Sequence, residues 1–219
     1  MKYLHLLFFL LFLPKITISS LEVSLNMFSS IFNFKPNNGF GNTAVYEHKG
    51  EEKTNWDIGS SGYYLTLAFN IYDFAKPGIF IGKSNPSEKI DSFNSYSHPT
   101  YQVSHLNYGL DLRLFPIRQY LFIRLGLLKS ISKHQLTLAN DSKIALFNFK
   151  GTGYQAGFGI DIPFEKACFD YNCGIQVEYL VRKAWATDID IKLSEIIYDD
   201  SVKPAYREQI LGLGLYWFY

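Results

Sequence analysis

The sequence predicts an all-β protein, a closed antiparallel up-and-down transmembrane β-barrel of about eight strands. Three observations predict this fold. An apolar N-terminal segment is typical of exported chains, hydrophobic side chains alternate with a period of two, and the connections fall into two length classes. About 200 residues remain after the N-terminal segment, which suits a single domain.

The N-terminal segment resembles a cleaved secretory signal peptide. Lys2 supplies a positive charge, the apolar run Leu4–Leu13 follows, and the small residues of 17–20 suit signal peptidase. The run is too short for a transmembrane helix, which needs roughly 20 residues. We therefore expect a signal peptide over residues 1–20 and a barrel domain over 21–219, with an uncleaved anchor as the alternative.

Composition excludes one class of partner and is compatible with a membrane. Removing Lys2 and Lys15 from the 21 basic residues leaves 19, against 20 acidic residues. No basic excess is left to neutralise phosphates, so we expect no nucleic-acid binding. The mean hydropathy of −0.03 is unremarkable, but the strands of a transmembrane barrel alternate and have ordinary averages. Aromatic residues make up 17% of the chain.

Alternation identifies the strands. It is clearest at the C-terminus, where one face would carry Leu211, Leu213, Leu215, Trp217 and Tyr219 and the other Gly212, Gly214, Tyr216 and Phe218. This period is typical of strands and not of helices. We expect strands near residues 21–34, 59–73, 78–84, 100–115, 119–138, 143–162, 173–187 and 205–219.

The connections are of two kinds. Those at 74–77, 115–118 and 163–172 are short or compact turns, and 139–142 closes a long hairpin. Longer polar stretches cover residues 35–58, 83–99 and 188–203. Short turns at one end and long loops at the other are typical of outer-membrane barrels, and an even strand count would leave both termini at the periplasmic end.

Alternation also fits a soluble lipocalin-like barrel, whose apolar face points inward. The residues opposite the leucines favour the membrane alternative, because they are mostly Gly, Asn, Asp, Arg and Gln, which fit a crowded interior. Opposite charges could pair there and avoid an unsatisfied burial. The charges expected in the lumen are Glu22, Asp111, Arg113, Arg124, Asp161 and Glu178; their alternative location is a solvated strand face.

The two cysteines, Cys168 and Cys173, lie close together in the sequence. In an oxidising periplasm such a pair predicts a disulfide that closes a small loop. A metal site would need more ligands, and no histidine or further cysteine lies nearby in the sequence. We expect a disulfide and no metal.

The C-terminus is the most specific feature. The alternating residues Leu211, Leu213, Leu215, Trp217 and Tyr219 resemble the signal that the barrel-assembly machinery reads on bacterial outer-membrane proteins. Phe is the commoner last residue there, and Tyr219 is a variant. With the signal peptide and the strand count, the chain resembles the OmpA/OmpX-type and opacity-like superfamily of small barrels. The resemblance implies an outer-membrane location, with membrane lipid and the assembly machinery as partners.

Candidate chemistry is sparse. Ser97-His98 and Ser104-His105 are adjacent pairs, and adjacent residues of a strand point to opposite faces, so neither pair is a dyad. Asp188, Asp190, Asp199 and Asp200 flank the last long loop. They could bind Ca²⁺, but their spacing matches no established calcium loop, and a solvated rim is the expected role. We expect no catalytic residue, no cofactor and no metal site.

Three functions are compatible with this sequence. The first is a non-enzymatic outer-membrane protein with an envelope-structural or surface-interaction role. The second is passage or binding of a small hydrophobic solute in a porin-like barrel, with Tyr64, Tyr72, Phe122 and Tyr216 as lumen-side aromatics. The third is a lipid-modifying enzyme of the outer leaflet. No sequence feature identifies an external partner.

Overall fold

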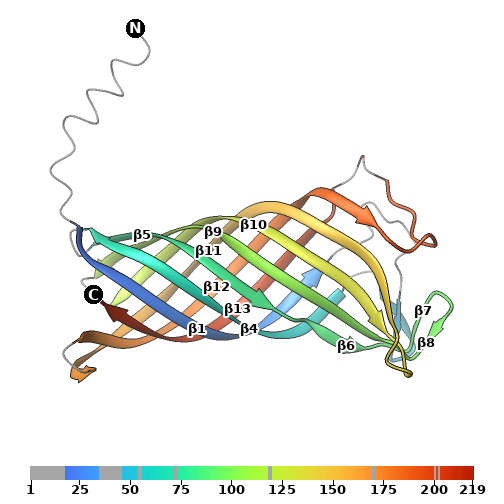
Figure 1. Cartoon of the computed structure of the whole chain (residues 1–219), viewed down its shortest axis with the longest axis horizontal. Coiled ribbons are helices and arrows are strands. Elements are labelled where there is room, and N and C mark those ends of the chain that lie inside the picture. Colours follow the sequence, from blue (N-terminus) through green and yellow to red (C-terminus); the bar gives the residue numbers. More distant parts are fainter. Residues whose placement is uncertain are drawn as a thin grey trace, which may run out of the picture.

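The alternating segments form long antiparallel strands that close into a barrel (Figure 1). The computed structural model describes residues 18–34, 46–53, 56–71, 74–117, 120–168, 171–199, 201 and 203–219. Eight strands make the wall: β1 (Ile18–Phe34), β4 (Trp56–Ile71), β5 (Ala75–Ser84), β9 (Thr100–Ile117), β10 (Leu121–Thr137), β11 (Lys143–Cys168), β12 (Tyr171–Ile191) and β13 (Ala205–Phe218).

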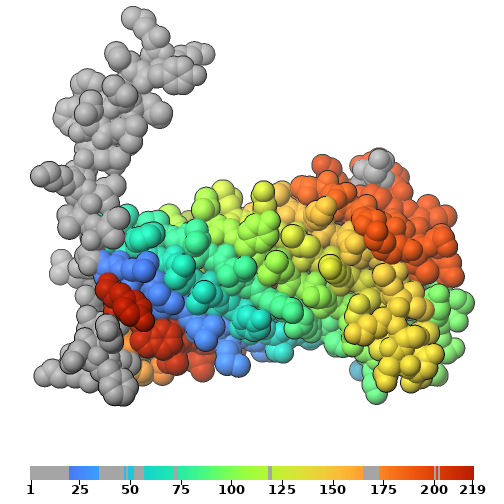
Figure 2. All heavy atoms as spheres, viewed as in Figure 1, coloured from blue at the N-terminus to red at the C-terminus, as the bar shows by residue number. Residues whose placement is uncertain are grey.

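Each barrel strand pairs with its neighbours in chain order, and the last strand pairs with the first. β13 lies antiparallel to β1 from Glu22↔Phe218 to Phe34↔Tyr206. In the space-filling view the blue first strand and the red last strand lie side by side (Figure 2). Closure leaves no unpaired barrel edge, which is the condition for a sheet that spans a membrane.

The strands are staggered around the barrel. A row of directly paired residues that starts at Leu67 of β4 returns to β4 at Asp57, ten residues away. The Leu67–Asp57 row runs through Leu67, Ile79, Leu110, Leu127, Tyr154, Lys183, Arg207, Asn33 and Asp57. Such a stagger requires tilted strands, so each row climbs from the end with the chain termini toward the opposite end.

The two ends of the barrel differ as the sequence predicts. The C-terminus lies at the end with the short connections, and β6 (Ser87–Lys89), β7 (Ser92–Phe93) and β8 (Tyr96–Ser97) lie at the other (Figure 1). We call these the turn end and the loop end. Two of the expected polar loops contain short strands: β2 (Tyr46–His48) and β3 (Glu51–Lys53) join β7 and β8 in a small sheet of order β3-β2-β7-β8.

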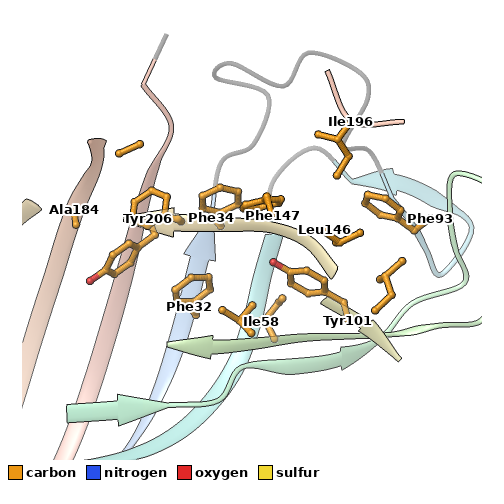
Figure 3. Close-up of a cluster of buried hydrophobic side chains, with 14 of the residues drawn as sticks. Phe32, Phe34, Ile58, Phe93, Tyr101, Leu146, Phe147, Ala184, Ile196 and Tyr206 are labelled. Carbon is orange, nitrogen blue, oxygen red and sulfur yellow. The ribbon is translucent and has the colours of Figure 1, made fainter. Parts of the chain in front are cut away.

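The barrel interior changes character along its length. Inward residues of β1 run from Glu22 at the turn end to Phe32 and Phe34 near the loop end. Around these phenylalanines lies an apolar cluster that includes Tyr101, Phe147, Phe149 and Tyr206 (Figure 3). Loop residues join the same cluster, so the loops pack over the barrel mouth; these residues are Ile90, Phe93 and Ile196.

The fold prediction is confirmed, and the eight strands lie close to their predicted positions. Three of the expected turns are shorter than predicted, because strands extend into them. β5 already begins at Ala75 within 74–77, β9 continues to Ile117 within 115–118, and β11 continues to Cys168 and β12 begins at Tyr171 within 163–172. β1 begins at Ile18, inside the predicted signal peptide, and the rest of that peptide lies outside the described residues. No described helix is long and apolar enough to cross a membrane.

Candidate functional site

The charged side chains of the interior form the first candidate site. All six charges expected in the lumen are buried inside the barrel, and Lys76, Arg182 and Glu208 join them. The described interior thus holds four cations and five carboxylates. Such groups are tolerated only when ion pairs and hydrogen bonds replace the lost hydration.

One ion-pair network lies nearest the turn end. Glu22 accepts a hydrogen bond from Lys76 Nζ at 2.7 Å, and the Arg113 guanidinium binds the same carboxylate. Lys76 Nζ also lies 3.5 Å from Asp161, which accepts a hydrogen bond from Gln176. These contacts join β1, β5, β9, β11 and β12 across the lumen, so they tie together strands that share no ladder.

A second network lies next along the barrel. Arg124 donates from Nε to Asp111 at 2.8 Å and from Nη1 to Glu178 at 2.7 Å. Its Nη2 donates to Thr66 at 3.0 Å. A guanidinium is suited to this position because its planar donors reach several partners at once. Arg182 and Glu208 form a further pair at 3.5 Å.

Three of the aromatic residues expected on the lumen side, Tyr64, Phe122 and Tyr216, lie close to these cations. The Arg124 guanidinium lies 4.9 Å from the Tyr64 ring centroid, and Arg113 lies 5.9 Å from that of Phe122. Lys76 Nζ lies 5.8 Å from the Tyr216 ring. Such cation–π contacts stabilise buried cations. Tyr72 lies outside the described residues.

The outer surface of the barrel is apolar. Large hydrophobic side chains of all eight strands are exposed, which is the reverse of a soluble protein. We call this surface the apolar belt. Its exposed members are Leu25, Met27, Ile31, Tyr63, Leu65, Phe69, Ile79, Ile81, Tyr108, Leu110, Ile123, Leu125, Leu127, Tyr154, Phe158, Ile160, Ile162, Val177, Trp185, Leu211, Leu213 and Leu215.

Three tyrosine–lysine pairs mark the belt's edge toward the loop end. The directly paired residues are Tyr63↔Lys83, Tyr108↔Lys129 and Tyr154↔Lys183, each on the outer face. Each pair belongs to a row of directly paired residues. When such a row is followed toward the loop end, apolar residues precede the tyrosine and the lysine comes next. Tyrosine followed by lysine suits a membrane–water interface, since the ring tolerates both media and the ammonium needs water.

Two buried histidines, His105 and His134, lie inside the apolar cluster. His105 Nε2 is 2.7 Å from Ser130 Oγ and 3.0 Å from Asn107 Oδ1. His134 Nε2 is 2.7 Å from Ser132 Oγ, and its Nδ1 contacts the Tyr101 hydroxyl. The phenylalanines of the cluster surround both rings, as the stacking of His134 on Phe147 at 4.2 Å illustrates. The hydrogen bonds pair the histidine nitrogens with hydroxyl and amide groups of the interior, except His105 Nδ1, which has no hydrogen-bond partner in the part of the chain that the structure describes.

The two predicted Ser-His sequences do not form dyads. Ser104 is exposed and the adjacent His105 is buried, as the alternation requires. His98 is exposed, with a positive φ of 48°. The nearest serine hydroxyl to His105 comes from Ser130 on the neighbouring strand, and a contact between strands is invisible to a local sequence motif.

The described acidic residues at the end of β12 pair with cations, and Asp199 in the loop that follows accepts a hydrogen bond from the Ser201 backbone N–H at 2.9 Å. Asp188 lies 2.9 Å from Lys150, and Asp190 lies 2.7 Å from Lys192. The hydrogen bond to Asp188 raises the pKa of Lys150, and the hydrogen bonds from Lys192 and Asn148 lower the pKa of Asp190. The described residues contain no group of three or more potential metal ligands. Asp200 lies outside them.

The cysteines and the C-terminal residues complete the predicted sites. Cys173 is buried in β12 and is disulfide-bonded, while the side chain of Cys168 lies outside the described residues. Their pairing therefore stays a prediction. The alternating C-terminal residues of β13 face outward, and Tyr219 exchanges backbone hydrogen bonds with Leu21 at 2.9 and 3.2 Å.

Comparisons with known proteins identify the fold. No protein-family model and no curated protein matches the chain. Among solved structures it is similar to Ail, the attachment invasion locus protein of Yersinia pestis, solved with the heparin analogue sucrose octasulfate. The TM-score is 0.50 at 9% identity, covering 90% of this chain and 98% of Ail.

Two further solved structures are similar at lower scores. Neisserial surface protein A gives a TM-score of 0.48 at 9% identity, covering 90% of this chain and 96% of that one. The outer membrane protease OmpT from Escherichia coli gives 0.39 at 8% identity, covering 95% and 99%. The likeness to Ail shows the fold alone, and this chain has the architecture of the small outer-membrane β-barrels.

Proposed function

We propose that the chain is an integral outer-membrane protein with an envelope-structural or surface-interaction role and no catalytic activity. The proposal depends on the polarity of the two faces of the barrel wall. Carboxylates and guanidinium groups fill the lumen, and leucines and isoleucines cover the outer surface. A soluble barrel of this size would have the opposite arrangement. Lipid is the solvent in which the apolar belt is stable, and an unpaired Arg on that belt would cost about 2–4 kcal/mol.

Export and orientation follow from the same proposal. Residues 1–20 act as a signal peptide, and the barrel-assembly machinery recognises the last strand, whose edge can add to another sheet before the barrel closes on β1. The turn end faces the periplasm and the loop end faces the exterior. The small sheet of β2, β3, β7 and β8 then forms part of the external surface.

The filled interior supports a structural role over solute passage. Ion-paired side chains occupy the turn half of the lumen, and the apolar cluster occupies the loop half. Ile90, Phe93 and Ile196 pack over the cluster from the loops. A solute would have to displace paired charges and a packed core in succession, and both are costly.

An epitope tag tests the location and the orientation together. We expect a tag inserted between Asn140 and Asp141, at the exposed tip of the β10–β11 hairpin, to bind antibody on intact cells. A tag inserted at Tyr120, in the β9–β10 connection of the turn end, should bind only after the outer membrane is permeabilised. Equal labelling of both tags on intact cells, or recovery of the chain in the soluble fraction, would refute the proposal.

A further inference from the structure

The outer surface has a cationic groove where the Leu67–Asp57 row leaves the apolar belt. The groove has a volume of about 600 Å³ and lies over β12, β13 and β1. Three cations line it: Lys183, Lys203 and Arg207. This position is just beyond the belt's edge on the loop side, as the Tyr154↔Lys183 pair marks it.

Two of these cations face each other across a strand pair, and no carboxylate among the described residues pairs with either. Lys183 and Arg207 are directly paired in the β12–β13 register, and like charges at directly opposite positions destabilise a sheet. Asp57 is the acidic residue that lines the groove, and it accepts a hydrogen bond from Asn33. An anion between Lys183 and Arg207 would turn the repulsion into attraction.

An apolar hollow continues from the cationic groove into the belt. Its volume is about 980 Å³, and it shares Tyr154 and Trp185 with the groove. These two rings lie 5.7 Å apart, and Lys183 Nζ lies 4.9 Å from the Trp185 ring. Beyond them the hollow runs over Leu127 and Leu110, which come earlier in the same row and therefore nearer the turn end.

We propose that the groove and the hollow together bind a phosphorylated lipid of the leaflet at the loop end. The phosphate binds Lys183, Lys203 and Arg207, and an acyl chain lies along Leu110 and Leu127. Arg207 can donate two parallel hydrogen bonds to phosphate oxygens, and the lysines add point charges. From the loop end toward the turn end, the site changes from cationic to apolar. This is the order in which the phosphate and the acyl chain of a phospholipid or phosphoglycolipid would lie. The proposal rests on the membrane location proposed above.

Native mass spectrometry of the full chain in detergent micelles tests this site with three probes. They are bisphosphorylated lipid A, the same lipid after dephosphorylation, and inorganic phosphate. We expect the bisphosphorylated lipid to bind about tenfold or more tightly than the dephosphorylated one. Inorganic phosphate should not compete with it at millimolar concentration. Competition by free phosphate at the lipid's own affinity would assign the groove to a free anion and overturn the proposal.

A double variant and a matched control locate the binding. Lys183→Gln with Arg207→Gln should weaken lipid binding about tenfold. Lys83→Gln with Lys133→Gln removes the same charge from exposed positions outside the groove and should leave binding unchanged. Equal binding by both double variants would overturn the proposal. A heat-dependent gel shift of each variant reports barrel formation independently, so loss of this site is distinguishable from failure of the membrane proposal.

Discussion

Arg124 illustrates at the scale of one residue how the interior is stabilised. The side chain is fully buried and donates to Asp111, Glu178 and Thr66, which lie on three other strands. Its charge offsets two carboxylates, so its removal leaves both of them buried without a hydrogen-bonded guanidinium group. Breaking a buried pair costs more than the pair itself contributes, since the remaining charge has lost both water and partner.

Replacing Arg124 with Met should therefore destabilise the barrel by about 3–5 kcal/mol, measured by urea unfolding in detergent micelles. Lys150→Gln is the control, because it breaks the exposed pair with Asp188, and its unfolding midpoint should match the unmodified chain. An Arg124→Met barrel as stable as the Lys150→Gln barrel would contradict the role assigned to the lumen charges.

Individual lumen residues were predictable where alternation was long and regular. Asp111, Arg113 and Glu178 occupy the polar phase of clear strands. Arg182 lies an even number of residues from Glu178, and Glu208 lies an even number from Gly212. The alternation therefore predicts an inward side chain for Arg182 and for Glu208 as well. Lys76 gave no such indication, because it lies in a segment that the sequence presents as a turn. Its position inside the barrel depends on pairing with β9, which is a non-local contact.

At the scale of elements, β11 and β12 are so close that several glycine positions of β11 have no room for a side chain, and Gly153 is the tightest of them. A Cβ on Gly153 would lie 1.9 Å from the backbone oxygen of Lys183 and 2.6 Å from Ala184 Cα. Both atoms belong to the ladder itself and cannot move without parting the strands. Gly59 of β4 has nothing within 4 Å of its ideal Cβ position.

We predict that Gly153→Ala destabilises the barrel by about 1–3 kcal/mol, as overpacking does in other well-packed structures. Gly59→Ala should change stability by no more than about 0.5 kcal/mol. Thermal gel-shift midpoints of the two variants, measured in the same detergent, provide the comparison. A neutral Gly153→Ala would mean that the β11–β12 pairing is looser than described.

The last strand combines two tasks, since it closes the barrel on β1 and carries the predicted assembly signal. Tyr219→Asp should lower the amount of heat-modifiable protein in the outer membrane several-fold, because a carboxylate replaces an exposed aromatic at the belt's edge. Tyr219→Phe keeps the ring and should assemble like the unmodified chain. Normal assembly of Tyr219→Asp would remove Tyr219 from the signal.

For the whole molecule, the belt and the stagger belong together. Each row of paired residues rises toward the loop end as it passes around the barrel. In three different rows, apolar residues give way to a cation, at Lys83 on β5, Lys129 on β10 and Lys183 on β12. Three independent rows thus agree on one boundary. The sequence predicted the alternation and the closed fold, but the boundary needed the register, since residues of one row lie far apart in the chain.

A charge placed inside this boundary should cost far more than one placed outside it. Leu110→Arg, in the belt, should destabilise the barrel in lipid vesicles by about 2–4 kcal/mol. Ser61→Arg is the matched control, because Ser61 is exposed on the outer face of β4 beyond Tyr63, toward the loop end. Its paired residue on β1 is the uncharged Ser29, so this variant should be close to neutral. Equal effects of the two variants would argue that no lipid boundary separates them.

The most direct test of the central claim, that the apolar belt faces lipid, is the accessibility of spin labels on β10 in lipid vesicles. Leu127→Cys and Lys133→Cys place labels on the same outer face, inside and outside the belt. We predict that the label at 127 collides mainly with dissolved oxygen and the label at 133 mainly with a water-soluble nickel chelate. Nickel-dominated collisions at both positions would show that water, and not lipid, covers the belt, and would contradict the account.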